Sequence, residues 1–412
     1  MLLLRLAWRN LFRNSRRTAL TAAAGVFAVA LSMTSLSLAL GSHERWIEHV
    51  VRLYSGHIEL TTAGYRAHRT LDHGMTLSDA DRRTLDELTE IDGWAPRLES
   101  WALVLPDRDG ALGRAAWVLG IDPSRESGLS RIGMALERAG LEAGAEHVGV
   151  VLGRDLADNL GVDRGDTVVL LTSDYYGSQS ADRFFVSGTI AVGDPTIDAY
   201  LALLHIRDLR EFVEYPAGVS HVAVFASDTQ EVESVRSVLA SAFPPPQFDV
   251  LSWHELIPDL VQMLVLDDVG NYLTLSVLIV VVTFGLLNTI LMSVFERVRE
   301  FGVMRAIGVR PRRIFALVLI EALMVSAIGL AVGFAISIPG LLWMEQHPIP
   351  MTAEALVGLF ELFGIEPVLA FRLSGLQVST LAGVLLGAAV LAALPPAWRA
   401  ARGRPADALS DA

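Results

Sequence analysis

The run VGNYLTLSVLIVVVTFGLLNTILMSVF, residues 269–295, contains no charged side chain, and charged residues lie only on either side of it. A helix needs about 20 apolar residues to cross roughly 30 Å of hydrocarbon, and this run exceeds that length. Helices on the surface of soluble proteins carry a continuous polar stripe, which this run lacks. The run therefore predicts a transmembrane helix rather than a buried helix of a soluble protein.

Three further segments have the same character, namely residues 18–41, 314–342 and 373–397, and only Glu321 places a charge inside any of them. Basic residues precede the first segment, as they do in a secretory signal peptide. The apolar region of such a signal is usually only about 7–15 residues, so a retained helix is favoured. The sequence thus predicts four transmembrane helices.

The arginines predict the orientation of these helices, because short cytoplasmic loops are enriched in Lys and Arg. The segments that carry them are the N-terminus, residues 296–313 and the C-terminal residues 398–412. Both termini and the 296–313 loop are therefore expected on the cytoplasmic side. Residues 42–268 and the loop 343–372 are expected outside. The arginines concerned are Arg5, Arg9, Arg13, Arg16, Arg17, Arg297, Arg299, Arg305, Arg310, Arg312, Arg313, Arg399, Arg402 and Arg404.

Residues 1–17 show a helical alternation of arginine with Leu4, Trp8 and Leu11. Such a pattern is typical of an amphipathic helix that lies along the lipid headgroups. The segment is predicted to be a cytoplasmic interfacial helix.

Residues 42–268 differ from the rest of the chain in charge, since they carry a net charge of −19 within a chain whose formal net charge is −13. Short β-type runs alternate there with helical patterns, which predicts an α+β domain of about two lobes. The Gly-Asp turns around residues 161–166 favour an inserted lobe at about 115–215. A strongly acidic domain has the wrong sign to bind nucleic acid.

Several chemistries are excluded by composition. All 33 Lys+Arg residues are arginine, and a P-loop needs its lysine on the nucleotide phosphates. The stretch starting at His43-Glu44 resembles the HExxH zinc motif, but Ile47 replaces the second histidine. We find no catalytic set, no metal site and no cofactor site, so the chain is not expected to be an enzyme.

Two pairs of glycines are spaced four residues apart within predicted helices, Gly329 with Gly333 and Gly383 with Gly387. Small residues at this spacing allow helix backbones to approach closely. These pairs are predicted to be packing surfaces, either within the chain or against a second chain.

The segment NTILMSVFERVREFGVMRAIGVR, residues 288–310, mixes apolar and charged residues beyond what a plain connecting loop needs. It indicates a short helix beneath the bilayer whose apolar residues Phe301, Met304 and Ile307 pack into a partner groove. The segment resembles the pattern N-T-x-x-x-S-V-x-E-R-x-R-E-x-G-x-x-R-A-I-G of the FtsX/MacB/Lol superfamily of ABC transporter permeases. The opening LAWRN of residues 6–10 and the closing PAWRAA of residues 396–401 also resemble that family.

This resemblance implies that the chain works in the bacterial inner membrane as a multi-pass permease with a periplasmic domain whose lobes are Porter-like and Sabre-like. It would pair with a second permease, either identical or related, and bind two copies of a separate ATPase that holds the ATP and Mg²⁺. Residues 296–308 would form the coupling helix on that ATPase, and mechanotransmission would move the external domain. The predicted coupling residues are Glu296, Arg297, Arg299, Glu300, Phe301, Gly302, Met304, Arg305, Ala306 and Gly308.

Length and plan are most similar to the lipoprotein-releasing LolC/LolE permeases, which implies release of a lipoprotein or another amphiphile to a periplasmic lipoprotein carrier. Two alternatives stay open. One is MacB-like export of a peptide or antibiotic-type substrate. The other is FtsX-like activation of a cell-wall hydrolase.

Overall fold

The computed structural model describes residues 6–10, 15–108, 112–139, 141, 148–353, 357–358 and 367–402. Parts of the predicted N-terminal helix, of the 343–372 loop and of the C-terminal tail lie outside these residues. The chain forms two compact units. Unit 1 comprises residues 1–43, 263–350 and 368–412, and unit 2 comprises residues 44–262 and 351–367.

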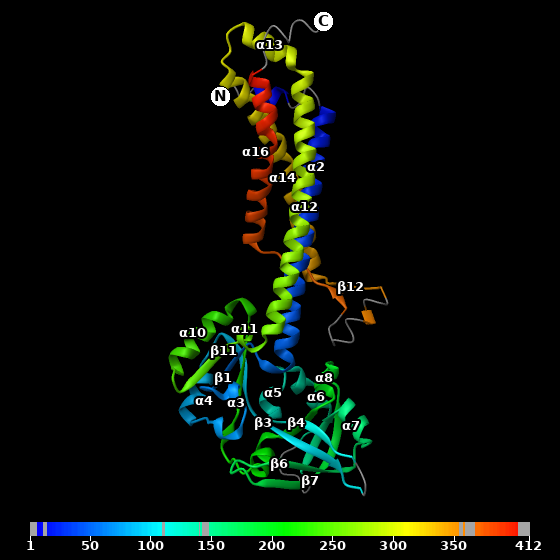
Figure 1. Ribbon diagram of the computed structural model, residues 1–412, viewed down its shortest axis with the longest axis vertical. Coiled ribbons are helices and arrows are strands. Elements are labelled where there is room, and N and C mark those ends of the chain that lie inside the picture. Colours follow the sequence, from blue (N-terminus) through cyan, green and yellow to red (C-terminus); the bar gives the residue numbers. More distant parts are fainter. Residues whose placement is uncertain are drawn as a thin grey trace. The chain divides into compact units, whose positions relative to one another are not determined.

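Unit 1 is built on four long helices, which are α2 (Ser15–Val50), α12 (Pro258–Glu296), α14 (Pro311–Gln346) and α16 (Gly375–Arg402) (Figure 1). Within the described residues these are the four helices long and apolar enough to cross a membrane, as predicted. α2 and α12 extend beyond the predicted spans at residues 41 and 269. The length of an apolar run indicates only the part of a helix that crosses the bilayer. The helix itself can continue into the polar residues next to that run.

Three prolines lie inside the membrane helices. Pro339 lies inside α14, which continues to Gln346. Pro395 and Pro396 lie inside α16, which continues to Arg402. Neighbouring helices and hydroxyl side chains can satisfy the backbone groups that a proline frees, so membrane helices tolerate it.

Polar contacts join α2 and α12 within unit 1. The Ser35 hydroxyl donates to Asn271 Oδ1 at 2.9 Å, and His43 Nε2 lies 2.7 Å from Asp267 Oδ2. An apolar cluster that includes Val29, Leu330 and Leu385 packs α2, α14 and α16 together. A short strand pair, β12 (Ile349–Pro350) with β13 (Val368–Leu369), follows α14.

Unit 2 contains a nine-stranded sheet that divides into two lobes. In the first, here called the sheet lobe, antiparallel pairing gives the order β11-β1-β10-β3. Short helices α3 and α4, helices α10 and α11, and the strand pair β2–β9 complete it. The bounds are β1 Ile58–Thr62, α3 Tyr65–His68, β2 Met75–Thr76, α4 Asp79–Asp86, β3 Ile91–Pro106, β9 Gly218–Val219, β10 His221–Ala226, α10 Val232–Ala242, β11 Phe248–Ser252 and α11 Trp253–Leu256.

The second lobe, here called the barrel lobe, is a closed ring of strands. From β3 the pairings run through β4, β8, β5, β7 and β6, and β6 pairs with β3 again. Helices α5 to α8 lie in the connections between these strands, and α9 follows β8. The bounds are β4 Arg114–Ile121, α5 Pro123–Glu126, α6 Arg131–Ala139, β5 Gly149–Gly153, α7 Arg154–Leu160, β6 Thr167–Ser173, β7 Gln179–Ile190, α8 Pro195–Asp198, β8 Leu201–His205 and α9 Ile206–Phe212.

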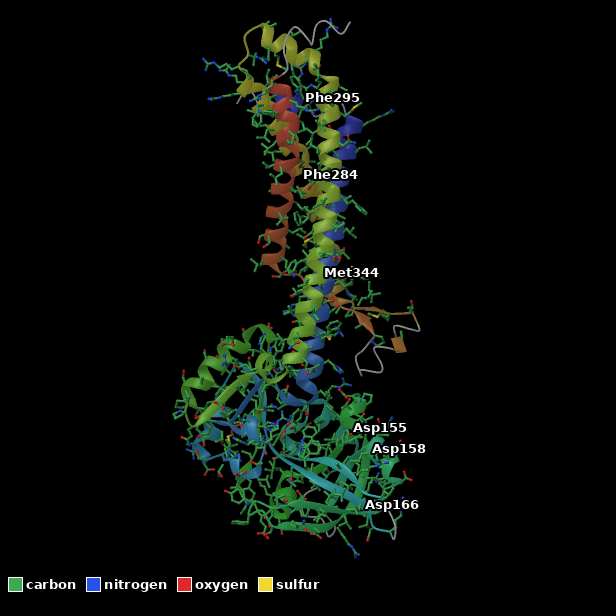
Figure 2. The ribbon with its side chains drawn as sticks, viewed as in Figure 1. Asp155, Asp158, Asp166, Phe284, Phe295 and Met344 are labelled. Carbon is green, nitrogen blue, oxygen red and sulfur yellow. The ribbon has the colours of Figure 1, made fainter. Side chains whose placement is uncertain are left out.

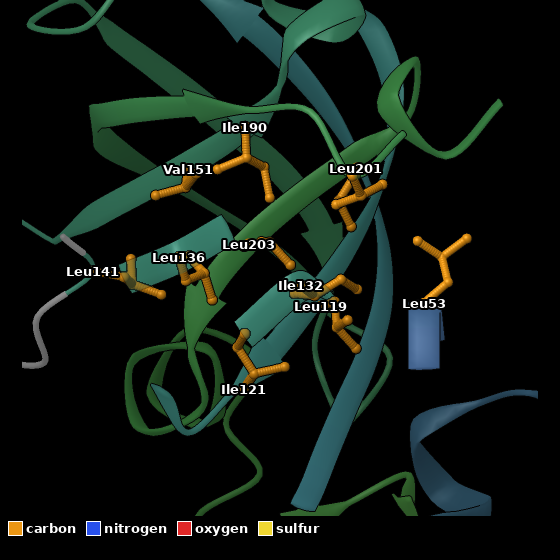
Figure 3. Packing of buried hydrophobic residues seen from close by; sticks show 11 residues of the cluster. Leu53, Leu119, Ile121, Ile132, Leu136, Leu141, Val151, Ile190, Leu201 and Leu203 are labelled. Atoms are coloured by element: carbon orange, nitrogen blue, oxygen red, sulfur yellow. The ribbon is translucent and has the colours of Figure 1, made fainter. Parts of the chain in front are cut away.

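The barrel lobe corresponds to the inserted lobe expected at about 115–215, but it begins earlier. β3 pairs with β10 up to Arg97 and with β4 from Leu98, so one strand serves both lobes. The core of the barrel lobe includes Leu119, Ile132 and Leu203 together with Leu53, which comes from the turn that follows α2 (Figure 3).

The surface of the barrel lobe carries part of the acidity seen in the sequence. Asp155 and Asp158 lie on α7, and Asp166 precedes β6 (Figure 2). α12, in contrast, exposes Phe284 at 66% and Phe295 at 54%. Exposed aromatic residues of this kind on a long apolar helix suit contact with lipid or another apolar surface.

Candidate functional site

The segment singled out by its motif forms a short helix, α13 (Val298–Ala306), between α12 and α14. Arg297 precedes it with non-helical backbone angles, and the Phe301 amide donates to the Arg297 carbonyl at 3.0 Å. The helix ends before Gly308, whose φ of +94° is a conformation that favours glycine. The chain then enters α14 at Pro311.

Arg297 fixes the start of α13 to α14. Its Nη1 lies 3.0 and 2.8 Å from the two carboxylate oxygens of Glu321, and its Nε donates to Glu300 at 2.9 Å. The Arg297 side chain is 9% exposed and that of Glu321 is 17% exposed. The charge that the sequence places inside the third span is therefore paired with the residue that precedes α13.

One face of α13 packs into its own helix bundle. Phe301 is 4% exposed, and Met304 packs against the same cluster of residues from α12, α14 and α16. Arg305 donates to the Ala401 carbonyl of α16 at 3.2 Å. Gly302 is also buried. The expectation that Phe301 packs into a partner groove is therefore wrong, because this ring fills the chain's own core.

The opposite face of α13 is exposed. Arg299, Val303 and Ala306 follow each other at helical spacing, and Ile307 is 76% exposed. Glu296 and Gly308 are exposed at the two ends. Val303, 46% exposed, was not among the predicted residues. Its spacing of four from both Arg299 and Ile307 is the signal that identifies it.

A small cavity adjoins the Arg297–Glu321 ion pair, with a volume of about 60 Å³. Most of its polar lining comes from hydroxyl side chains, and a small polar cavity of this kind is suited to hold water. The cavity keeps a polar environment around the ion pair within an otherwise apolar bundle. The polar lining residues are Asn10, Thr18, Thr21, Thr289, Ser293, Arg297, Glu321 and Ser326.

The two glycine pairs have different surroundings. A Cβ on Gly329 would lie 2.8 Å from the Ala22 carbonyl oxygen, and one on Gly333 would lie 2.7 Å from Val29 Cβ. This pair thus brings α14 close to α2. Gly383 and Gly387 have no heavy atom of the described chain within 4 Å of the corresponding position.

Family comparisons agree with this architecture. Residues 272–405 match the FtsX-like permease C-terminal family model, and residues 18–242 match the MacB-like periplasmic core domain family model. The second match alone spans more than half of the chain.

Relatives match over most of their length. The chain is 26% identical to the lipoprotein-releasing system transmembrane protein LolC of Xylella fastidiosa, over 94% of this chain and 92% of that protein. It is 24% identical to LolE of Haemophilus influenzae, over 93% and 91%. The crystal structure of the periplasmic region of MacB from Actinobacillus actinomycetemcomitans shares 15% identity and a TM-score of 0.32, covering 50% of this chain and 92% of that one.

The two family models together cover residues 18–242 and 272–405, which hold all of α13, α14 and α16 and most of α2, α12 and unit 2. The chain belongs to the family of ABC transporter permeases that combine a MacB-like periplasmic core domain with an FtsX-like permease domain.

Proposed function

We propose that this permease couples ATP hydrolysis by a separate ABC ATPase to the release of a lipoprotein or another amphiphile at the outer face of the bacterial inner membrane. Two copies of the ATPase serve two permeases, the second being identical or related. The ATPases bind ATP and Mg²⁺. A periplasmic lipoprotein carrier receives the cargo.

The observation that carries this proposal is the two-sided construction of α13. Its inner face is fixed by the Arg297–Glu321 ion pair and by Phe301 in the bundle core. Its outer face presents Val303 and Ile307 to the surroundings. A rigidly held helix with an exposed apolar face is suited to transmit a push from a docked protein to the membrane helices.

The orientation proposed from the arginines places this outer face in the cytoplasm, where an ATPase finds ATP. Arg299 and Arg310 are exposed in or beside α13. In the same orientation, unit 2 lies in the periplasm with its acidic surface. Both termini then lie in the cytoplasm.

The names of the relatives support a lipoprotein as the cargo. LolC and LolE, which match over more than nine-tenths of this chain, are named as parts of a lipoprotein-releasing system. MacB-like export is the alternative, since the external domain matches the MacB-like model. Charged residues inside the spans are few, which supports work by the external domain rather than passage of a hydrophilic solute between the helices.

The first experiment tests the docking face. The tagged full chain is purified from its native membranes after mild crosslinking, and the ATP hydrolysis that co-purifies is measured. We expect Val303→Asp with Ile307→Asp to reduce this activity at least tenfold, because two charges would enter an apolar contact. The matched control is Leu112→Asp with Tyr176→Asp, which adds the same two charges at positions of unit 2 that are 83% and 74% exposed.

Undiminished ATP hydrolysis with the double variant would contradict docking at this face. The cargo is then tested with proteoliposomes that contain the purified complex and a triacylated lipoprotein. ATP-dependent appearance of the lipoprotein in the soluble fraction supports lipoprotein release. Release of a macrolide or peptide instead, with the lipoprotein retained, favours MacB-like export.

A further inference from the structure

The end of α2 is built differently from the rest of that helix. Residues Val51–Ser55 form one π-helical turn, which ends at Gly56 with a φ of +73°. Isolated π-helical turns are uncommon and often occur at functional positions. Val51, Leu53 and Ser55 are buried, so this turn lies inside unit 2 rather than on its surface.

Leu53 enters the core of the barrel lobe. It is 4% exposed and belongs to the cluster formed by β4, β5, β8 and α6, including Leu119, Ile132 and Leu203 (Figure 3). Tyr54 follows it and packs edge-on against Trp117 of β4, with ring centroids 4.6 Å apart. The turn that follows α2 thus contributes side chains directly to this core.

A buried arginine holds the same turn. Arg97 Nη1 donates to the Tyr54 carbonyl, and its Nε and Nη2 donate to Glu126 at 2.6 and 3.0 Å. The side chains of Arg97 and Glu126 are both 0% exposed. The last carbonyls of a helix have no partner within the helix, and here a fully buried guanidinium supplies one. Ser130 donates to Glu126 as well.

Arg97 occupies the boundary between the lobes. On β3 it pairs with His221 of the sheet lobe, whereas the next residue, Leu98, pairs with Gly120 of the barrel lobe. Its ion-pair partner Glu126 lies on α5, directly after β4 of the barrel lobe. The guanidinium therefore joins the end of α2, the shared strand and the barrel lobe at one point.

The sheet lobe is tied to the π-helical turn through Arg52 and to the preceding turn of α2 through Glu48. Arg52 Nη2 donates to Asp92 of β3 at 2.8 Å, and its Nε donates to Glu48 at 2.6 Å. Thr229 donates to Glu48 at 3.3 Å. The end of α2 and the turn that follows it consequently contact both lobes. Arg52 makes a charged contact with the sheet lobe. Leu53 packs in the core of the barrel lobe, and Tyr54 accepts a hydrogen bond from the ion-paired Arg97.

From this geometry we propose that Leu53, Tyr54 and Arg97 form a joint that sets the angle between the two lobes and makes the barrel lobe follow the end of α2. Arg97 is a positioning residue in this joint. β3, common to both lobes, is the strand about which the barrel lobe turns. The role in transmission rests on the proposed function, whereas the setting of the lobe angle does not.

The chain contains no cysteine, so pairs of spin labels can be introduced without removing any native residue. One label is placed at Tyr176→Cys in the barrel lobe and the other at Val238→Cys in the sheet lobe, positions that are 74% and 47% exposed. Distances between the labels are measured by double electron–electron resonance on the full chain in nanodiscs. The unmodified joint should give one narrow distribution.

Leu53→Ala should at least double the width of this distribution. The control is Leu136→Ala, which truncates a leucine of the same core, 2% exposed, away from the joint. Arg97→Met with Glu126→Leu replaces the ion pair by apolar side chains, which protects folding, and removes the donor to Tyr54. This double variant should also broaden the distribution. Narrow distributions in both joint variants, or equal broadening by Leu136→Ala, would overturn the joint.

The second measurement separates this inference from the proposed function. In proteoliposomes with the co-purified ATPase, Leu53→Ala should retain ATP hydrolysis within twofold while lipoprotein release falls at least tenfold. Unchanged release would overturn transmission through the joint. Absence of ATP hydrolysis in the unmodified complex would refute the proposed function, and the label distances would still decide whether the joint sets the lobe angle.

Discussion

The Arg297 guanidinium lies within 3.0 Å of both carboxylate oxygens of Glu321, so the residue that begins α13 is bound to the interior of α14. The two residues are 24 positions apart in the sequence. The pair places a charge inside a span at low cost, because each ion neutralises the other. It also links the start of α13 directly to α14.

Glu321→Ala should weaken this attachment. It leaves Arg297, in a largely buried position, with Glu300 as its remaining carboxylate partner in the described part of the chain. Removal of one partner of a buried ion pair typically costs about 3 kcal/mol or more, so we expect a lower Tm of the purified full chain. ATP hydrolysis by the co-purified ATPase should also lose its dependence on the permease.

The double variant Arg297→Met with Glu321→Leu serves as the control for stability. Apolar replacements of similar volume often restore or raise stability when both charges are removed. A Tm close to that of the unmodified chain is expected. A double variant as unstable as Glu321→Ala would show that the ion pair is not the cause of the loss.

Phe301→Ala and Val303→Ala should differ sharply although the residues are two positions apart. Phe301 fills the bundle core, and truncation of a buried phenylalanine costs about 3–5 kcal/mol. Val303 is exposed, so its truncation should change stability by less than about 0.5 kcal/mol. Thermal unfolding of the two variants in detergent measures this difference. Equal losses would contradict the assignment of Phe301 to the buried face and Val303 to the exposed face of α13.

The close approach of α14 to α2 gives a third prediction. Gly333→Val should lower the Tm by several degrees, because its Cβ would lie 2.7 Å from Val29 Cβ. Gly383→Val meets open space and should leave the monomer stable. If Gly383→Val instead reduces the fraction of paired permeases after crosslinking, that face of α16 contacts the second permease.

A pH effect is expected from Glu99 in unit 2. Burial raises the pKa of its carboxyl to about 8. Its neighbours are His221, with Nδ1 3.6 Å from Glu99 Oε1, and the Tyr65 hydroxyl at 3.3 Å. Burial also lowers the pKa of His221 well below its usual value. Both groups are therefore neutral in the folded protein near pH 7.

The direction in which stability changes with pH follows from the number of protons that the folded and unfolded states bind. The folded state keeps the Glu99 proton between about pH 4.5 and 8, whereas the unfolded state loses it, so stability falls as the pH rises through this window. His221 has the opposite effect, confined to pH values below about 6.5. Glu99→Gln should therefore reduce the loss of Tm between pH 5 and pH 8. An unchanged loss would exclude ionisation of Glu99 as its cause.

The membrane helices were predictable because a charge-free run of about 20 residues has few alternatives. The division of α13 into two faces was harder to predict. Phe301 and Ile307 are both apolar, and their positions alone do not show which of the two faces the bundle. The pairing of Arg297 with Glu321 could not be predicted from the sequence either, because it depends on how the chain turns between α13 and α14.

The strands of the external domain were largely recognisable from their residue types, but their pairing was not. β3 spans Ile91–Pro106 as one strand that is shared by both lobes. Closure of the barrel depends on pairing of its last residues with β6, about 65 positions later in the sequence. Contacts of this range leave no local periodic pattern.

The continuity of β3 has a practical consequence for chimaeric proteins. Any exchange of the barrel lobe between relatives would have to cut inside β3, which is hydrogen-bonded along its length. Each half of the strand would then lose the half that continues it. A splice at the ends of residues 44–262 severs no strand of this sheet. Grafts that respect those ends should therefore fold, whereas grafts of the barrel lobe alone should yield insoluble product.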